Sequence, residues 1–117
     1  MPKVTFEGAD DNLVTPQYST GTGPVVRSDN LEVTKISFEK GKGAEVHSHP
    51  EEQVMYVLDG RLEVTCGDET YEIGPGEATF NPSDVPHAVM ALEDTTGLSL
   101  KNQVAPIYEP TGSLAGE

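Results

Sequence analysis

All three histidines of this 117-residue chain stand at spacings that suit a metal centre. His47 and His49 are two residues apart, and Gln53 follows four residues later. Because side chains of an extended strand repeat every two residues, these three can project from one face of a sheet. Imidazole nitrogens and an amide oxygen suit a divalent Fe, Mn, Ni, Co or Zn ion. We predict one such ion bound by these residues together with His87; the alternative is a structural role for the histidines.

The segments that must position these residues are predicted to be short strands. Helical periodicity is absent, and 12 glycines and 9 prolines supply frequent turns. The phases of two neighbouring apolar segments disagree, which predicts a bulge or a bend near Lys35. The roughly eight expected strands indicate a sandwich or a small closed barrel. They cover residues 4–6, 31–33, 36–38, 53–58, 62–66, 71–73, 87–92 and 98–104.

The same alternation predicts a largely apolar substrate pocket. If Gln53 and His87 point inward, every second residue after them does so too, whereas Tyr56 points outward. The expected pocket residues are Met55, Val57, Val89 and Ala91. Glu51 and Glu52 are expected at the solvated mouth of the barrel. Cys66 is expected to be a buried residue that packs against apolar neighbours rather than a nucleophile. No general base is assigned, so the catalytic residues stay unknown.

The spacing of glycines and histidines resembles the two sequence motifs of the cupin family. The first motif reads Gly41, five residues, His47, Ser48, His49, three residues, Gln53, six residues and Gly60. The second reads Gly76, five residues, Pro82, Ser83, Asp84, two residues, His87, three residues and Ala91. The family has Glu, Gly and Asn where this chain has Gln53, Asp84 and Ala91. The alternative for Gln53 is a polar barrel residue beside a three-histidine site.

The resemblance implies an all-β fold, a single jelly-roll (cupin) β-barrel. One domain would then cover residues 1–117, with the motif core at 41–91. Residues 1–30 would form an N-terminal strand and a polar arm, and residues 105–117 a tail. The resemblance also implies a homodimer, formed through the N-terminal strand and an outer barrel face.

For function, the resemblance implies a metal-dependent enzyme acting on a small oxygen-rich or enolisable molecule. Because glutamine adds no negative charge, the ion should be a strong Lewis acid, as an isomerase, cyclase or lyase requires. The variant motif is similar to cupins of uronate metabolism and to metal-dependent polyketide cyclases. The uronate cupins carry an acidic residue in the last strand, where this chain has Leu100, Lys101 and Asn102. The alternatives are a non-haem iron dioxygenase of the quercetinase or diketone-cleaving type and a non-catalytic metal- or ligand-binding module.

Charge and composition limit the classes of binding partner that this chain can have. The 20 acidic residues against 7 basic ones give a net charge of −13, which repels nucleic acid and anionic membranes. The excess of acidic residues is explained either by a need for solubility or by a salt-rich cytoplasm, in which a surface of carboxylates stays hydrated. No apolar run approaches the roughly 20 residues of a membrane span, and no secretion signal is visible. With Cys66 as its single cysteine, we predict a cytoplasmic protein whose partner is a small-molecule substrate.

Overall fold

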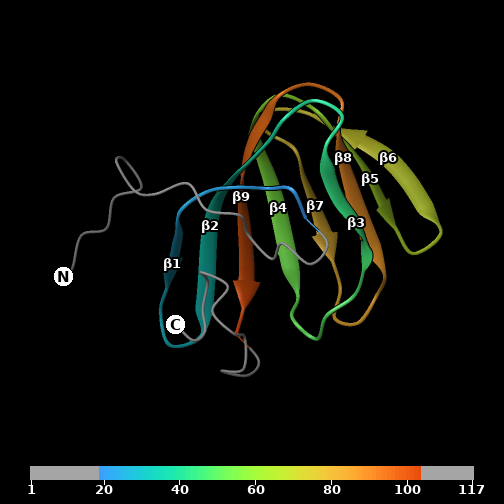
Figure 1. Cartoon of the computed structure of the whole chain (residues 1–117). Coiled ribbons are helices and arrows are strands. Elements are labelled where there is room, and N and C mark those ends of the chain that lie inside the picture. The colour runs from blue at the N-terminus through green and yellow to red at the C-terminus, as the bar shows by residue number, and fades with distance from the viewer. Residues whose placement is uncertain (1–18, 104–117) are drawn as a thin grey trace.

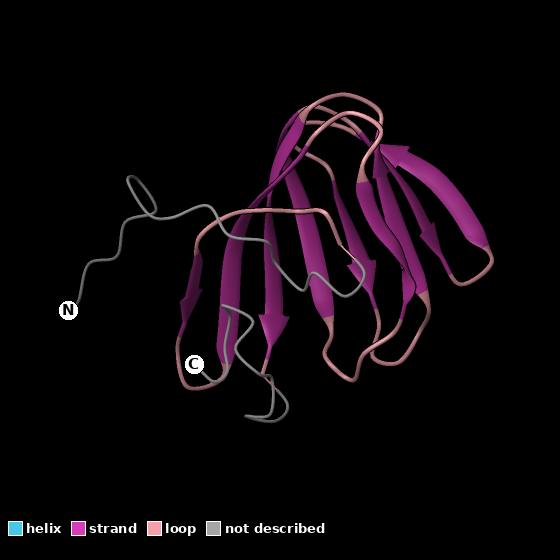
Figure 2. Cartoon of the chain, viewed as in Figure 1, coloured by secondary structure: helices cyan, strands magenta, loops and turns pink. Residues whose placement is uncertain are grey.

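The computed structural model describes residues 19–103, which form two antiparallel sheets that face each other (Figures 1 and 2). The nine strands are β1 (Val25–Arg27), β2 (Leu31–Phe38), β3 (Gly43–His47), β4 (Gln53–Asp59), β5 (Leu62–Cys66), β6 (Glu69–Ile73), β7 (Ala78–Asn81), β8 (His87–Ala91) and β9 (Thr95–Asn102). One sheet has the order β1-β2-β9-β4-β7 and the other β3-β8-β5-β6. The predicted all-β jelly-roll fold is therefore confirmed. In the described part of the chain, no helix is long and apolar enough to span a membrane.

Several sequence expectations need correction or lie outside the described residues. The predicted bulge near Lys35 is wrong: β2 is continuous and pairs with β9 without interruption from Leu31 to Phe38. The phases disagree because Leu31, 58% exposed, belongs to the outer face, whereas Ile36 and Phe38 are buried. Strands 25–27, 43–47 and 78–81 lie outside the expected ranges. The predicted strand 4–6 and the tail 105–117 lie outside the described residues.

The inner face of the five-stranded sheet is layered from one end to the other. Strand register defines three successive rows, each running across neighbouring strands. The end row is polar and consists of Glu32, Lys101, Gln53 and Asn81. The middle row is Thr34, Ser99, Met55 and Thr79, and the third is Ile36, Gly97 and Val57. All of these residues are buried, so this sheet carries polar groups into the barrel at one end and apolar groups at the other.

The outer face of the same sheet is apolar. Its exposed large side chains are Leu31, Val54, Tyr56, Leu58, Phe80 and Leu100. Register places Leu100 between Val33 and Val54, and Val54 beside Phe80, so the apolar row crosses four strands. Tyr56 is outward, as predicted, and 37% exposed. The usual alternation of polar-out and apolar-in side chains is therefore inverted over this part of the sheet.

The hydrophobic core lies between the two sheets. Its buried members are Ile36, Phe38, Met55, Val57, Leu62, Val64, Ile73, Val89 and Ala91. The predicted alternation of residues 62–66 is confirmed for Leu62 and Val64, whereas Cys66 is only half-buried. The expected turn at Gly60 joins β4 to β5 with a φ of 99°. A Cβ atom there would lie 2.4 Å from the carbonyl oxygen of Asp94, so both conformation and space require glycine.

Candidate metal centre

The three histidines come together from two strands and one connecting segment. His47 ends β3 and pairs with His87, which begins β8, so both belong to the four-stranded sheet. His49 lies in the connection between β3 and β4, and Gln53 begins β4 in the other sheet. The expectation that one strand face carries His47, His49 and Gln53 is therefore wrong. The chain crosses between the sheets after His47, and this crossing brings the four residues to one cavity.

The imidazole rings are close enough to share one ion. Ring centroids of His47 and His87 are 4.3 Å apart, those of His49 and His87 4.7 Å, and those of His47 and His49 5.4 Å. One ligand nitrogen from each ring lies within 4.8 Å of the others. This three-histidine cluster has the donor type and the spacing that a transition-metal ion requires.

Each imidazole is oriented by a hydrogen bond to the backbone two residues away. Nδ1 of His47, His49 and His87 donates to the carbonyl oxygens of Glu45, Glu51 and Val85 at 2.6, 3.1 and 2.9 Å. A carbonyl can only accept, so each Nδ1 carries the proton and each Nε2 keeps its lone pair. The Nε2 atoms of His49 and His87 are buried and have no hydrogen-bond partner among residues 19–103. Buried nitrogen acceptors of this kind are suited to bind a metal ion.

Burial keeps the histidines neutral, which is the form that binds metal. It lowers the pKa of His47 and of His49 to about 4, and it also lowers the pKa of His87. The positive charge of Lys101 depresses all three pKa values further. At neutral pH the cluster therefore presents nitrogen lone pairs rather than protons.

Gln53 lies at the cavity, 8% exposed and hydrogen-bonded on both sides. Its Nε2 donates to Oγ of Ser99 at 2.7 Å, and its Oε1 accepts from Nδ2 of Asn81 at 3.2 Å. These bonds fix the amide and leave one lone pair of Oε1 for a further partner. The side chain thus meets the chemical requirement of a fourth, uncharged ligand.

The predicted pocket residues divide into two groups. All four belong to the hydrophobic core, but only Met55 and Val89 also line the cavity with the histidines. The free space in the cavity is about 30 Å³, which is room for an ion or a water molecule or two.

Glu51 is buried, contrary to the prediction of a solvated mouth. It is 2% exposed, and its Oε1 lies 3.5 Å from Nδ1 of His49. The connection folds inward because the amide of Asp84 donates to the carbonyl oxygen of His49 at 2.8 Å. Burial raises the pKa of the Glu51 carboxyl group. Its neighbour Glu52 is exposed, as expected.

Lys101 is the site residue that sequence reasoning did not assign. It is 9% exposed and lines the same cavity as the histidines. The alternation of β9 suggested the opposite orientation, because Leu98 and Leu100 would ordinarily point inward. Instead Gly97, Ser99 and Lys101 are buried. The one available signal was that the last strand has Leu100, Lys101 and Asn102 where the resemblance to uronate cupins implies an acidic residue.

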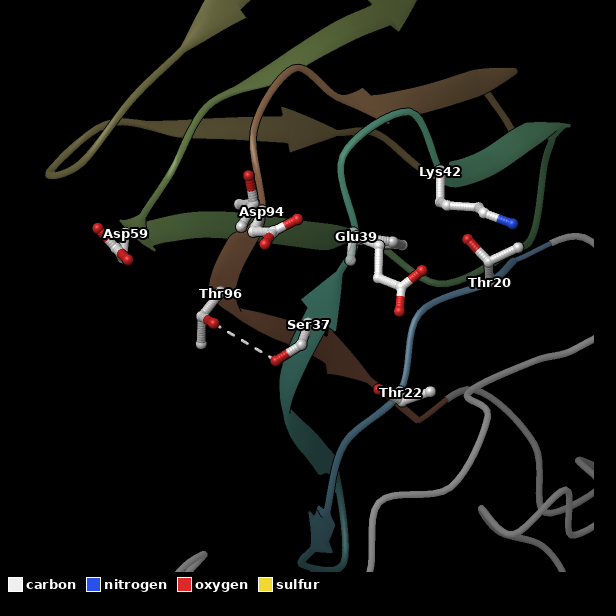
Figure 3. A pocket seen from close by; sticks show the side chains of 10 residues that line it. Thr20, Thr22, Ser37, Glu39, Lys42, Asp59, Asp94 and Thr96 are labelled. Atoms are coloured by element: carbon white, nitrogen blue, oxygen red, sulfur yellow. Dashed lines mark hydrogen bonds between the residues drawn. The ribbon is translucent and has the colours of Figure 1, made fainter.

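A second and larger hollow lies toward the other ends of β2 and β9. Its volume is about 520 Å³, and Figure 3 shows hydroxyl and carboxylate side chains around it. Ser37 and Thr96 share a hydrogen bond of 3.4 Å, and Oδ1 of Asp94 accepts from the amide of Lys40 at 2.9 Å. No histidine lines this hollow. Among the described residues, the one group of three or more side chains placed to share a metal ion is the histidine cluster of the smaller cavity.

Two facing antiparallel sheets around convergent histidines define a small jelly-roll protein with a histidine cluster in its interior. The family model for the cupin domain matches residues 34–100. The chain therefore belongs to the cupin family, as its two motifs indicated.

Known proteins of several activities are similar to this chain. It is 33% identical over 74 residues to dimethylsulfoniopropionate lyase DddQ of Ruegeria pomeroyi, covering 62% of this chain and 37% of the lyase. It is 30% identical over 89 residues to quercetin 2,3-dioxygenase of Bacillus subtilis, covering 73% of this chain and 26% of the dioxygenase. The chain thus spans well under half of these relatives. The structure of KdgF from Halomonas sp. matches with a TM-score of 0.74 at 25% identity, over 86% of this chain and 94% of that chain.

Proposed function

We propose that this protein is a metal-dependent enzyme that acts on a small oxygen-rich or enolisable molecule, as an isomerase, cyclase or lyase. The observation that carries the proposal is the shared orientation of the histidines. In each, Nδ1 is tied to a backbone carbonyl, and the ligand nitrogens of the three lie within 4.8 Å. Similarity to a lyase of the same family supports a reaction of this type.

In this proposal His47, His49 and His87 hold one divalent Fe, Mn, Ni, Co or Zn ion, and Gln53 adds its amide oxygen. When bound, such an ion supplies a Lewis acid that polarises a carbonyl or enolate oxygen. All four donors are neutral, so they leave the positive charge of the site uncompensated. The backbone carbonyls and the Ser99 hydroxyl group hold the donors in orientation. Met55 and Val89 limit the water around the bound molecule.

Elemental analysis of protein purified without added metal tests this proposal. We expect close to one ion per chain in the wild type and loss of most of it in His47→Ala, His49→Ala or His87→Ala. Val46→Ala is the matched control, because Val46 neighbours His47 but is 68% exposed. Full metal content after two histidine replacements would contradict the proposed site.

A non-haem iron dioxygenase is the second candidate, favoured by the similarity to quercetin 2,3-dioxygenase over 73% of this chain. Parallel aerobic and anaerobic purifications separate the two functions. Iron that is lost or oxidised in air, with oxygen consumption by the loaded protein, would favour the dioxygenase. Zinc, nickel or manganese that is indifferent to air would favour Lewis-acid chemistry.

We also propose that the protein forms a homodimer through the outer face of its five-stranded sheet. Leu31, Val54, Phe80 and Leu100 are between 38% and 58% exposed on that face, and an apolar surface of this extent favours burial against a partner. The free thiol of Cys66 agrees with the reducing cytoplasm in which we place the enzyme.

A further inference from the structure

Lys101 has a largely buried side chain at the cavity. The side chain is 9% exposed, and within residues 19–103 its ammonium group has neither an ion pair nor a hydrogen bond. Its cross-strand neighbour Glu32 lies instead 3.8 Å from Nη2 of Arg27. A buried charge is unfavourable unless an opposite charge or hydrogen bonds compensate it. The position of Lys101 therefore calls for an anionic partner that enters the cavity.

The surroundings of Lys101 locate that partner next to the histidines. Lys101 pairs with Gln53 across β9 and β4, and both line the cavity that contains the imidazoles. A divalent ion at the histidines and an ammonium group at the same cavity repel each other. A ligand anion between them would relieve this repulsion and complete the hydrogen bonds of the ammonium group.

The nearby carboxylates do not fill this role. Glu32 interacts with Arg27, and Glu51 contacts Nδ1 of His49, on the protonated edge of the ring rather than at its free Nε2. Neither forms an ion pair with Lys101. The positive charge of Lys101 partly offsets the burial that raises the pKa of Glu51, so this carboxyl group is an electrostatic neighbour of Lys101 but not its ion-pair partner.

We propose that Lys101 is a specificity-determining residue that binds a carboxylate of the ligand, so the pocket selects small carboxylic acids with a second donor for the metal. This inference rests on the proposed function and names its substrate class. The ammonium group would hold the carboxylate by a charge-assisted hydrogen bond while the second donor reaches the ion.

The experiment compares two thiols that differ only in charge, 3-mercaptopropionate and 3-mercaptopropionamide. Each is titrated into the Co²⁺-loaded protein, and the thiolate-to-cobalt absorption band reports binding without any need for turnover. We expect the wild type to bind the carboxylate at least about tenfold more tightly than the amide. Lys101→Met should abolish this preference and leave the affinity for the amide unchanged.

Two further variants serve as controls. Lys101→Arg retains a cation and should retain the preference. Lys40→Met removes one positive charge from an exposed position and should also retain it, which separates a local contact from net charge. Lys101→Met should in addition raise the melting temperature of the metal-free protein, because it replaces a largely buried ammonium group that has no ion pair within residues 19–103 by an apolar side chain.

The outcomes distinguish the two proposals. Equal binding of the two thiols by the wild type, or an unchanged preference in Lys101→Met, would overturn the role of Lys101 while leaving the metal centre intact. Failure of the wild type to bind Co²⁺, or absence of a thiolate band with either compound, would overturn the proposed metal enzyme and with it this inference.

Discussion

Gln53 is the residue whose charge would most directly set the properties of a bound ion. Gln53→Glu replaces a neutral donor by a carboxylate, while Ser99 can still donate from its hydroxyl group and Asn81 from its amide. We expect the variant to bind the ion more tightly, by about tenfold or about 1.4 kcal/mol, and to be a weaker Lewis acid. Competition with a chromophoric chelator measures the affinity. An unchanged affinity would show that residue 53 does not contact the ion.

Asp84 adopts a left-handed backbone conformation, with a φ of 64°, at a position where the family motif has glycine. Its amide donates to the carbonyl oxygen of His49, so this turn supports the histidine segment. Because the side chain is exposed and accepts one hydrogen bond, from the Ser83 hydroxyl group at 3.3 Å, Asp84→Ala mainly tests the backbone conformation. We expect it to lower the free energy of unfolding by about 1 kcal/mol in urea titrations.

Asp84→Gly is the matched variant. Glycine reaches a positive φ without strain but loses more chain entropy on folding, so its stability should stay within about 1 kcal/mol of the wild type. Greater stability for alanine than for glycine would show that the turn relaxes to another conformation.

At the scale of the element, sequence alternation predicts which residues share a face but not which face is inside. The histidines and the jelly-roll fold were predictable because the motif spacing is specific. The orientation of β9 was not, because its leucines point outward and Ser99 and Lys101 point inward. Glu51 was missed for a different reason: its burial depends on a tertiary hydrogen bond between Asp84 and His49, which no local pattern encodes.

Two threonines in the middle row of the five-stranded sheet test how polar side chains that point into the barrel affect stability. Oγ1 of Thr34 is buried without a hydrogen-bond partner in the described part of the chain. Thr34→Val keeps the shape of the side chain and removes the unsatisfied hydroxyl group. We expect it to raise the free energy of unfolding by about 1 kcal/mol, measured by urea denaturation of the metal-free protein.

Thr79 provides the control in the same row, because its hydroxyl group is hydrogen-bonded to that of Tyr71. Thr79→Val leaves the tyrosine without this partner and should lower stability by about 1–3 kcal/mol. If both valine variants changed stability in the same direction, the difference in hydrogen bonding between the two threonines would not be the cause.

At the scale of the whole molecule, the apolar outer face gives the proposed dimer a specific test. Val54 lies in this face between Leu100 and Phe80, so Val54→Lys would place a charge within the interface. We expect the wild type to sediment as a dimer and Val54→Lys as a monomer in analytical ultracentrifugation. Val46→Lys makes the same change on β3, in the other sheet, and should remain dimeric.

The exposed apolar row also determines how heat capacity should change on unfolding. Unfolding usually raises heat capacity by about 12–15 cal/mol/K per residue, because apolar side chains enter water. In an isolated subunit, Leu31, Phe80 and Leu100 are already hydrated in the native state, so the increment per residue should fall below that range. A dimer that covers these side chains would expose them to water only on unfolding, so its heat-capacity increment per residue would return to the usual range. Calorimetry at increasing protein concentration should therefore give a heat-capacity increment that grows with assembly.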